Sequence, residues 1–137
     1  MRRIDLILVH CSATAEGVDV STDTIRRWHV KGNGWKDIGY HYVVELDGSV
    51  HGGRMESVAG AHCAGHNANS IGVCYVGGLA KDGKTPKDTR TDAQKRSLLA
   101  LLRMLKKKYP EAVIRGHRDF AAKACPCFDA TKEYGRI

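Results

Sequence analysis

The sequence has no long hydrophobic run, only three prolines and only two phenylalanines. No stretch approaches the ~20 apolar residues that a membrane-spanning helix needs. The apolar run over residues 4–9 is too short for a secretory signal peptide, so we expect neither a membrane anchor nor a leader. Hydrophobic residues make up 42% and charged residues 27%, which argues against disordered, collagen-like and coiled-coil proteins. The 137 residues predict one folded domain spanning residues 1–137.

Acidic residues are outnumbered, with 15 Asp and Glu against 22 Lys and Arg and a formal net charge of +7. Such an excess favours polyanionic partners, namely nucleic acid, anionic lipid or anionic cell-wall polymer. The sequence lacks the aromatic pattern of RNA-recognition motifs and the two-histidine spacing of zinc fingers. Its densest basic run, residues 106–108, falls at the end of an expected helix, where cations complement the helix dipole. We expect no nucleic acid and no membrane as partner.

The five cysteines are an odd number in a chain without a recognisable leader, which argues against a disulfide framework. Cys74 lies in the apolar run 71–76 and is interpreted as a small buried apolar residue. Cys125 and Cys127 differ, because they flank Pro126 in a turn where a thiolate could meet a metal ion. Such a site needs further ligands from other parts of the chain.

Hydrophobic patterning predicts an α/β fold with a central mixed β-sheet flanked by helices. The expected strands are short and rich in apolar residues, and they cover residues 4–9, 40–46, a segment from 50 onward, 71–76 and 113–115. The second and third of these flank Asp47-Gly48, a dipeptide typical of hairpin turns. This hairpin makes the expected sheet mixed, because the other strands alternate with helices and loops.

Two helices are expected, each with a recognisable start. Ser21 is the expected N-cap of a helix over residues 22–31. Thr91 and Gln94 form a capping box that begins a longer helix, which ends before Pro110. Residues 60–69 and 81–90 lack apolar periodicity and are expected to be loops.

Three residues that can bind a soft or borderline metal follow expected strands or lie just beyond the last one. His10 follows the first strand, His117 follows the last, and Cys125 lies in the loop after it. Two imidazoles and a thiolate are a suitable zinc set, and three protein ligands leave a fourth position for water, as in catalytic zinc sites. From spacing alone, hydrogen-bonded structural histidines remain the alternative interpretation.

Four stretches of the chain resemble the type 2 family of zinc-dependent N-acetylmuramoyl-L-alanine amidases, which includes peptidoglycan recognition proteins and phage lysins. They occur in the family's order and cover residues 7–14, 37–54, 60–73 and 116–126. The first contains His10-Cys11-Ser12, and the last contains His117 and Cys125. The resemblance implies a peptidoglycan recognition protein-like amidase fold and hydrolysis of the amide between N-acetylmuramic acid and L-alanine.

Carried over residue by residue, the resemblance implies that one zinc ion is bound by His10, His117 and Cys125. It places the family's active-site tyrosine at Tyr40 and its active-site lysine at Lys123. Attack on the amide carbonyl creates a negatively charged oxygen, which the lysine ammonium is expected to stabilise. Tyr40 either orients the attacking water or donates a hydrogen bond to the developing charge.

The loop over residues 60–69 corresponds to the family's groove-lining loop, and we expect His62 and Asn67 to contact the substrate. His62 and His66 are four residues apart, but Gly65 and Asn67 argue against the helix that would bring them together as a second metal pair. A proton shuttle is not assigned. Its acidic candidates are Glu45, Glu56 and Asp119.

The resemblance implies a phage or prophage endolysin that remains in the host cytoplasm until the membrane is permeabilised and then cleaves peptidoglycan. The alternative is a non-catalytic peptidoglycan-binding module of the same fold, and an interbacterial toxin or wall-recycling enzyme is also consistent with the motifs. A phage member of the family binds RNA polymerase. Because only nine residues precede His10, we expect no such binding here, and we expect a monomer.

Overall fold

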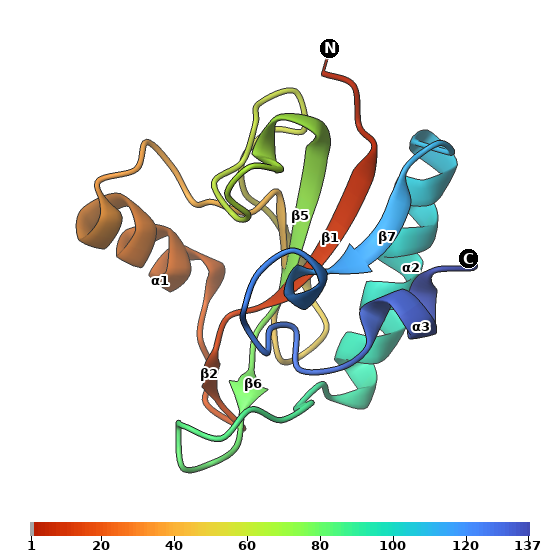
Figure 1. Cartoon of the computed structure of the whole chain (residues 1–137). Helices are drawn as coiled ribbons and strands as arrows, with labels where there is room; N and C mark the ends of the chain where they lie inside the picture. Colours follow the sequence, from red (N-terminus) through yellow and green to blue (C-terminus); the bar gives the residue numbers. More distant parts are fainter. Residues whose placement is uncertain (1) are drawn as a thin grey trace.

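The computed structural model describes residues 2–137, which form one five-stranded sheet with helices on both faces (Figure 1). The strand order is β4-β3-β5-β1-β7. The strands span Leu6–Cys11 (β1), Tyr42–Val44 (β3), Val50–Gly52 (β4), Ser70–Tyr75 (β5) and Val113–Gly116 (β7). Only the β3–β4 hairpin is antiparallel, so the predicted mixed sheet is confirmed.

Strands β1 and β5 occupy the middle of the sheet and are buried along nearly their whole length. Parallel strands covered on both faces have nearly continuous apolar sequences, as these two do. Their register places Ile7 beside Ile71 and His10 beside Cys74. The first strand was predicted over residues 4–9, but pairing with β5 continues to Cys11, which lies opposite Tyr75.

Helix α2, Asp92–Lys108, covers one face of the sheet. Its capping box forms as predicted, because Thr91 accepts from the Gln94 backbone and the Gln94 side chain accepts from the Thr91 backbone. The buried Gln94 amide also donates to the carbonyls of Val44 and Val76, which ties the helix start to two strands. The buried leucines of the helix, which include Leu98, Leu102 and Leu105, pack on alternate side chains of β1 and β5.

The opposite face is covered by α1, Thr22–Arg27, which continues into a π-helical turn over Trp28–Gly32. Ser21 caps α1 by accepting a hydrogen bond from the backbone of Thr24, as predicted. The single α-helix expected over residues 22–31 is wrong in its second half, because the wider π-helical turn replaces the last α-helical turn. Since side chains alternate along a strand, His10 points to the face opposite α2 whereas Cys11 packs on the α2 side.

Several short elements have no counterpart in the sequence prediction. Strand β2 (Thr14–Ala15) pairs with β6 (Gly78–Leu79), 3-10 turns span Asn67–Asn69 and His117–Asp119, and helix α3 spans Ala130–Tyr134. Elements of two to five residues are too short to show a hydrophobic period. Within residues 2–137, no helix has both the length and the apolar character needed to cross a bilayer.

Arg90 fixes the C-terminal segment against the loop that precedes α2. Its side chain is 2% exposed, and its guanidinium donates to Asp88, to Glu133 at 2.7 Å and to the Tyr134 hydroxyl at 2.6 Å. It also lies 3.5 Å from the ring centre of Phe128. These contacts hold the segment that follows Cys125, so they support a loop that carries one of the predicted ligands.

We predict that Arg90→Met lowers the free energy of unfolding by about 3 kcal/mol, because it leaves the two carboxylates without their cation. Urea unfolding followed by circular dichroism measures the change. Arg103→Ala is the control, since Arg103 is exposed on α2 and its removal is expected to cost less than about 0.5 kcal/mol. A similar small change in both variants would contradict the anchoring role of Arg90.

Candidate active site

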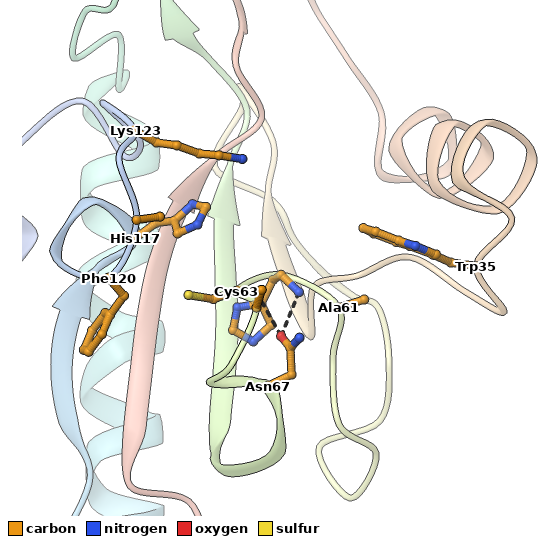
Figure 2. Close-up of a pocket in the computed structure, with 10 residues that line it drawn as sticks. Trp35, Ala61, Cys63, Asn67, His117, Phe120 and Lys123 are labelled. Carbon is orange, nitrogen blue, oxygen red and sulfur yellow. Dashed lines mark hydrogen bonds between the residues drawn. The ribbon is translucent and has the colours of Figure 1, made fainter.

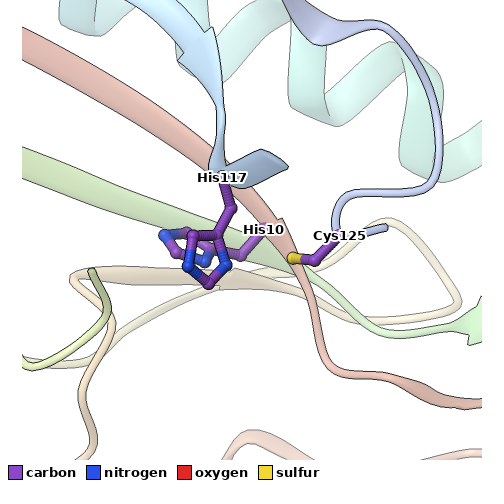
Figure 3. A group of neighbouring side chains, drawn as sticks. All are labelled: His10, His117 and Cys125. Carbon is purple, nitrogen blue, oxygen red and sulfur yellow. The ribbon is translucent and has the colours of Figure 1, made fainter. Parts of the chain in front are cut away.

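Three predicted ligands converge where β1 and β7 end (Figure 3). His10 comes from β1, His117 begins the turn directly after β7, and Cys125 lies in the following loop. One donor atom from each lies within 4.8 Å of the others. His10 is 1% exposed and His117 is 8% exposed. Because β1 and β7 are adjacent and parallel, their carboxyl ends bring the two histidines together.

A chain of hydrogen bonds orients the His10 ring. Its Nε2 lies 2.8 Å from Nδ1 of His62, and Nε2 of His62 lies 3.1 Å from Oγ of Ser70. All partners are satisfied when each Nε2–H donates along this chain toward Ser70. Nδ1 of His10 then keeps its lone pair, and a partner on the second ring nitrogen is what metal-binding histidines generally have.

The electrostatics of the cluster favour neutral imidazoles. Burial lowers the pKa of His10 well below its ordinary value, and the nearby rings of His62 and His117 add to the effect. Burial likewise lowers the pKa of His117, and lowers that of His62 to about 3. Sγ of Cys125 lies 3.1 Å from the backbone N–H of Cys11, a donor that stabilises a thiolate. Neutral imidazole nitrogens and a thiolate suit Zn²⁺, so this donor set fits the metal.

A pocket of about 380 Å³ opens beside the cluster (Figure 2). Trp35 borders it on one side, whereas Lys123 and His117 extend into it from the opposite side. A second hollow, of about 240 Å³, adjoins it and contains the three predicted ligands together with Tyr40. Several residues line both hollows, including Trp35, His62 and Lys123, so together they form one continuous groove with the ligands at its floor.

Comparison with known proteins identifies the family of the chain. The profile of the N-acetylmuramoyl-L-alanine amidase family matches residues 1–128. The chain belongs to this amidase family. It is 50% identical over 125 residues to the endolysin of Escherichia phage T7, covering 91% of this chain and 82% of that protein. The human N-acetylmuramoyl-L-alanine amidase is 35% identical over 103 residues, which cover 75% of this chain and 18% of the human protein.

Solved structures confirm the fold expected of an amidase of this family. The amidase LysC from Clostridium intestinale superposes with a TM-score of 0.80 at 28% identity, over 96% of this chain and 82% of its own. Bumblebee PGRP-SA superposes with a TM-score of 0.80 at 26% identity, over 99% of this chain and 83% of its own. The predicted peptidoglycan recognition protein-like fold is therefore correct.

The two residues predicted to assist the amidase chemistry both line the groove. The Tyr40 ring centre lies 5.2 Å from that of His10. Burial raises the pKa of Tyr40 well above its ordinary value, so the phenol stays protonated and can donate a hydrogen bond. Lys123 is exposed on the loop between His117 and Cys125, and its positive charge contributes to the lowered pKa of both His10 and His117.

The two predicted substrate contacts of the amidase also lie in the groove, but both have structural partners. The Asn67 side-chain oxygen accepts from the backbone N–H groups of His62 and Cys63, each at 2.9 Å, and thereby shapes the loop. His62 has both ring nitrogens engaged, toward His10 and Ser70. Within residues 2–137, His66 belongs to no group of three or more possible metal ligands. Its ring centre lies 4.5 Å from that of Phe120, which lines the groove.

The acidic residues considered for proton transfer in the amidase have other partners. Glu45 accepts from the backbone and hydroxyl of Thr22, and Asp119 accepts from Gly116 and Thr131. Glu56 accepts from the hydroxyls of Tyr42 and Tyr109. None of these three carboxylates lines the groove beside the ligand cluster.

Sequence reasoning missed several residues that shape the site. Ser70 ends the hydrogen-bond chain from His10, and Phe120 and Ala121 line the groove. His29 accepts from the Gly39 backbone at 2.8 Å and lines the hollow near Tyr40. Gly72 lies directly under the His62 ring, where a Cβ would approach ring atoms to 2.7 Å. A glycine inside a strand is the usual signal of such a close approach.

We predict that Gly72→Ala lowers the free energy of unfolding by about 1–3 kcal/mol, because the new methyl group must displace the His62 ring or the strand. Urea unfolding measures the loss, and NMR of the histidine ring protons reports the displacement. Gly52→Ala is the matched control, since Gly52 is also in a strand but has no atom within 4 Å of an added Cβ. Equal losses in the two variants would show that the space under His62 is not the cause.

Proposed function

We propose that the chain is a zinc-dependent amidase that hydrolyses the bond between N-acetylmuramic acid and L-alanine in peptidoglycan. The observation that carries this proposal is the convergence of two histidines and a cysteine at the floor of a groove, in a chain of the amidase family. The net charge of +7 suits an anionic wall polymer. Peptidoglycan is the proposed partner, and no nucleic acid, membrane or RNA polymerase is included among the partners.

The proposed zinc ligands are His10, His117 and Cys125. When bound, zinc lowers the pKa of water toward neutrality and polarises a carbonyl group, which is the chemistry that amide hydrolysis requires. The protein keeps both imidazoles neutral through burial, so they do not need to lose a proton before they bind a cation. Three protein ligands would leave a fourth coordination position for water, as in catalytic zinc sites.

Lys123 and Tyr40 are the proposed catalytic residues. Hydrolysis of the amide places negative charge on the former carbonyl oxygen, and a cation aimed at that oxygen stabilises the transition state. Lys123 lies on the groove wall and supplies this charge. The protonated phenol of Tyr40 donates a hydrogen bond, either to the attacking water or to the developing oxyanion.

The stem peptide and its sugar are proposed to lie along the groove, where Trp35, His62 and Asn67 form part of the wall. Because the Asn67 side-chain oxygen is engaged by the loop backbone, its amide nitrogen is the group proposed to contact the substrate. The Trp35 indole offers an apolar face to the same groove. Together these residues would hold the scissile amide above the three ligands.

The biological role that we propose is that of a phage or prophage endolysin, acting as a monomer. Endolysins of Escherichia phage T7 and Enterobacteria phage T3 are 50% and 49% identical to this chain. Such an enzyme accumulates in the host cytoplasm and reaches the wall after the membrane is permeabilised. Cleavage of intact sacculi supports this role, whereas cleavage of soluble muropeptides alone would favour a wall-recycling enzyme.

We predict that Cys125→Ser loses bound zinc and lowers the release of amines from sacculi by more than about 100-fold, because it removes a metal ligand. Zinc content is measured by mass spectrometry of the metal, and amines are counted together with reducing sugar ends. Cys127→Ser is the matched control, two residues away, and should retain both properties. Loss of zinc and of amine release in Cys127→Ser but not in Cys125→Ser would show that the ligand is Cys127.

We predict that Lys123→Ala retains zinc but lowers kcat by about 10²–10³-fold, because it removes charge stabilisation rather than a ligand. Steady-state kinetics on a soluble muropeptide separates kcat from KM. Lys107→Ala removes an exposed lysine of α2, the helix on the face of the sheet opposite to His10, and should leave kcat unchanged. Loss of zinc in Lys123→Ala would contradict the proposed role.

A further inference from the structure

Two cysteine thiols that are not among the proposed zinc ligands lie close together beside the ligand cluster. Sγ of Cys11, at the end of β1, lies 3.9 Å from Sγ of Cys127, in the loop after Pro126. The two residues are 116 positions apart in the sequence. We call them the Cys11–Cys127 pair. All five cysteines are present as free thiols, so the contact is between two reduced side chains.

The backbone around the pair is shaped to bring these sulfurs together. Cys127 has φ of +70°, a left-handed conformation that non-glycine residues adopt at an energetic cost. Gly78 packs against both thiols, and a Cβ at this position would lie 2.4 Å from Sγ of Cys11 and 3.7 Å from Sγ of Cys127. A side chain at residue 78 would therefore occupy the space that the two sulfurs share.

The pair lies beside the proposed metal ligands, because Cys11 follows His10 directly and its thiol also neighbours that of Cys125. Cys11 packs with the core on the α2 side of the sheet, whereas the preceding residue, His10, points to the opposite face. Cys125 directs its sulfur to the backbone N–H of Cys11, at 3.1 Å, rather than to the Cys127 sulfur. A bond between Cys11 and Cys127 would leave all three ligand side chains unmodified.

We propose that the Cys11–Cys127 pair is a redox-sensitive dithiol that closes to an intramolecular disulfide in an oxidising compartment. A disulfide requires the sulfurs to approach to ~2.05 Å, which rotation of the two side chains and a small movement of the loop can provide. The bond would tie the end of β1 to the loop that carries Cys125. It would thus join two segments that each contribute a proposed ligand.

Oxidation needs an acceptor of two electrons, and a small-molecule disulfide such as oxidised glutathione supplies it. Cys127 is half-buried and Cys11 is buried, so the thiolate of Cys127 attacks first and breaks the glutathione disulfide. One glutathione thiolate leaves and takes up the proton that Cys127 lost. The thiolate of Cys11 then attacks Cys127 and releases the second glutathione, so two protein thiols are oxidised and one disulfide is reduced to two thiols.

The closed bond is expected to stabilise the protein, because it restricts the unfolded chain over almost its whole length. Bacterial periplasm and extracellular spaces are oxidising, whereas cytoplasm is reducing. That the protein passes from the cytoplasm to an oxidising compartment rests on the proposed function. The formation of the bond does not depend on that function, because it is measured without any assay of peptidoglycan cleavage. The two proposals can therefore fail separately.

The test uses the full-length protein with one equivalent of added zinc, incubated in buffers with varied ratios of reduced to oxidised glutathione. Because Cys11 is buried and Cys127 is half-buried, thiol exchange is slow, and the incubation must continue until the ratio of products is constant. Free thiols are then alkylated and the cross-linked peptides are sequenced by mass spectrometry. Thermal unfolding is recorded for the oxidised and the reduced protein.

The expected result is a single bond between Cys11 and Cys127, with zinc retained and Tm raised by about 5 °C or more. The bond should be absent in Cys11→Ser and Cys127→Ser but present in Cys63→Ser, a variant that removes a different thiol. Alkylation of both thiols in the most oxidising buffer would overturn the proposal. So would a bond that includes Cys125 and expels zinc, or a Cys11–Cys127 bond that leaves Tm unchanged.

Discussion

The parallel pairing of β1 with β5 and β7 is the constraint on which the site depends. β1 carries His10, β7 ends immediately before His117, and β5 begins with Ser70 and contains Gly72. Pairing in this register places the two proposed histidine ligands at one edge of the sheet and leaves space for the His62 ring over the middle strand. The leucines of α2 cover the other face of the sheet with a buried apolar layer.

A second group of contacts holds the loop that supplies Cys125. The Tyr75 hydroxyl donates to the Pro126 carbonyl at 2.6 Å, and the Arg118 backbone donates to the Cys125 carbonyl at 2.8 Å. Arg90 secures the following segment through Glu133. The loop that carries the proposed ligand Cys125 is therefore held by contacts on both sides of this residue, which matters because catalytic metal sites tolerate only small displacements.

Much of this arrangement could be predicted from the sequence, because local signals are strong where they determine structure. The apolar runs around Ile7 and Ile71, and the capping box at Thr91, mark elements that the structure contains. The positions of His10 and His117 after expected strands made them candidate ligands, and the resemblance to the amidase family singled out these two together with Cys125.

The rest depends on distance in space rather than on neighbours in the sequence. The hydrogen bond between His10 and His62 joins residues 52 positions apart, and the Cys11–Cys127 contact joins residues 116 apart. Neither leaves a periodic pattern. The sequence around Gly72 does not indicate that the His62 ring packs against it. The π-helical turn after Arg27 likewise replaces an α-helical turn that local signals favoured.

The most direct test of the account is the release of L-alanine amino termini from purified peptidoglycan, with reducing sugar ends counted in parallel. The measurement is made on the protein as purified, after chelation, and after restoration with one equivalent of zinc. We expect the release of amines without new sugar ends, and we expect this release to be lost on chelation and recovered with zinc. Tight binding to peptidoglycan without cleavage, in protein that contains one zinc ion, would contradict it and indicate a recognition module instead.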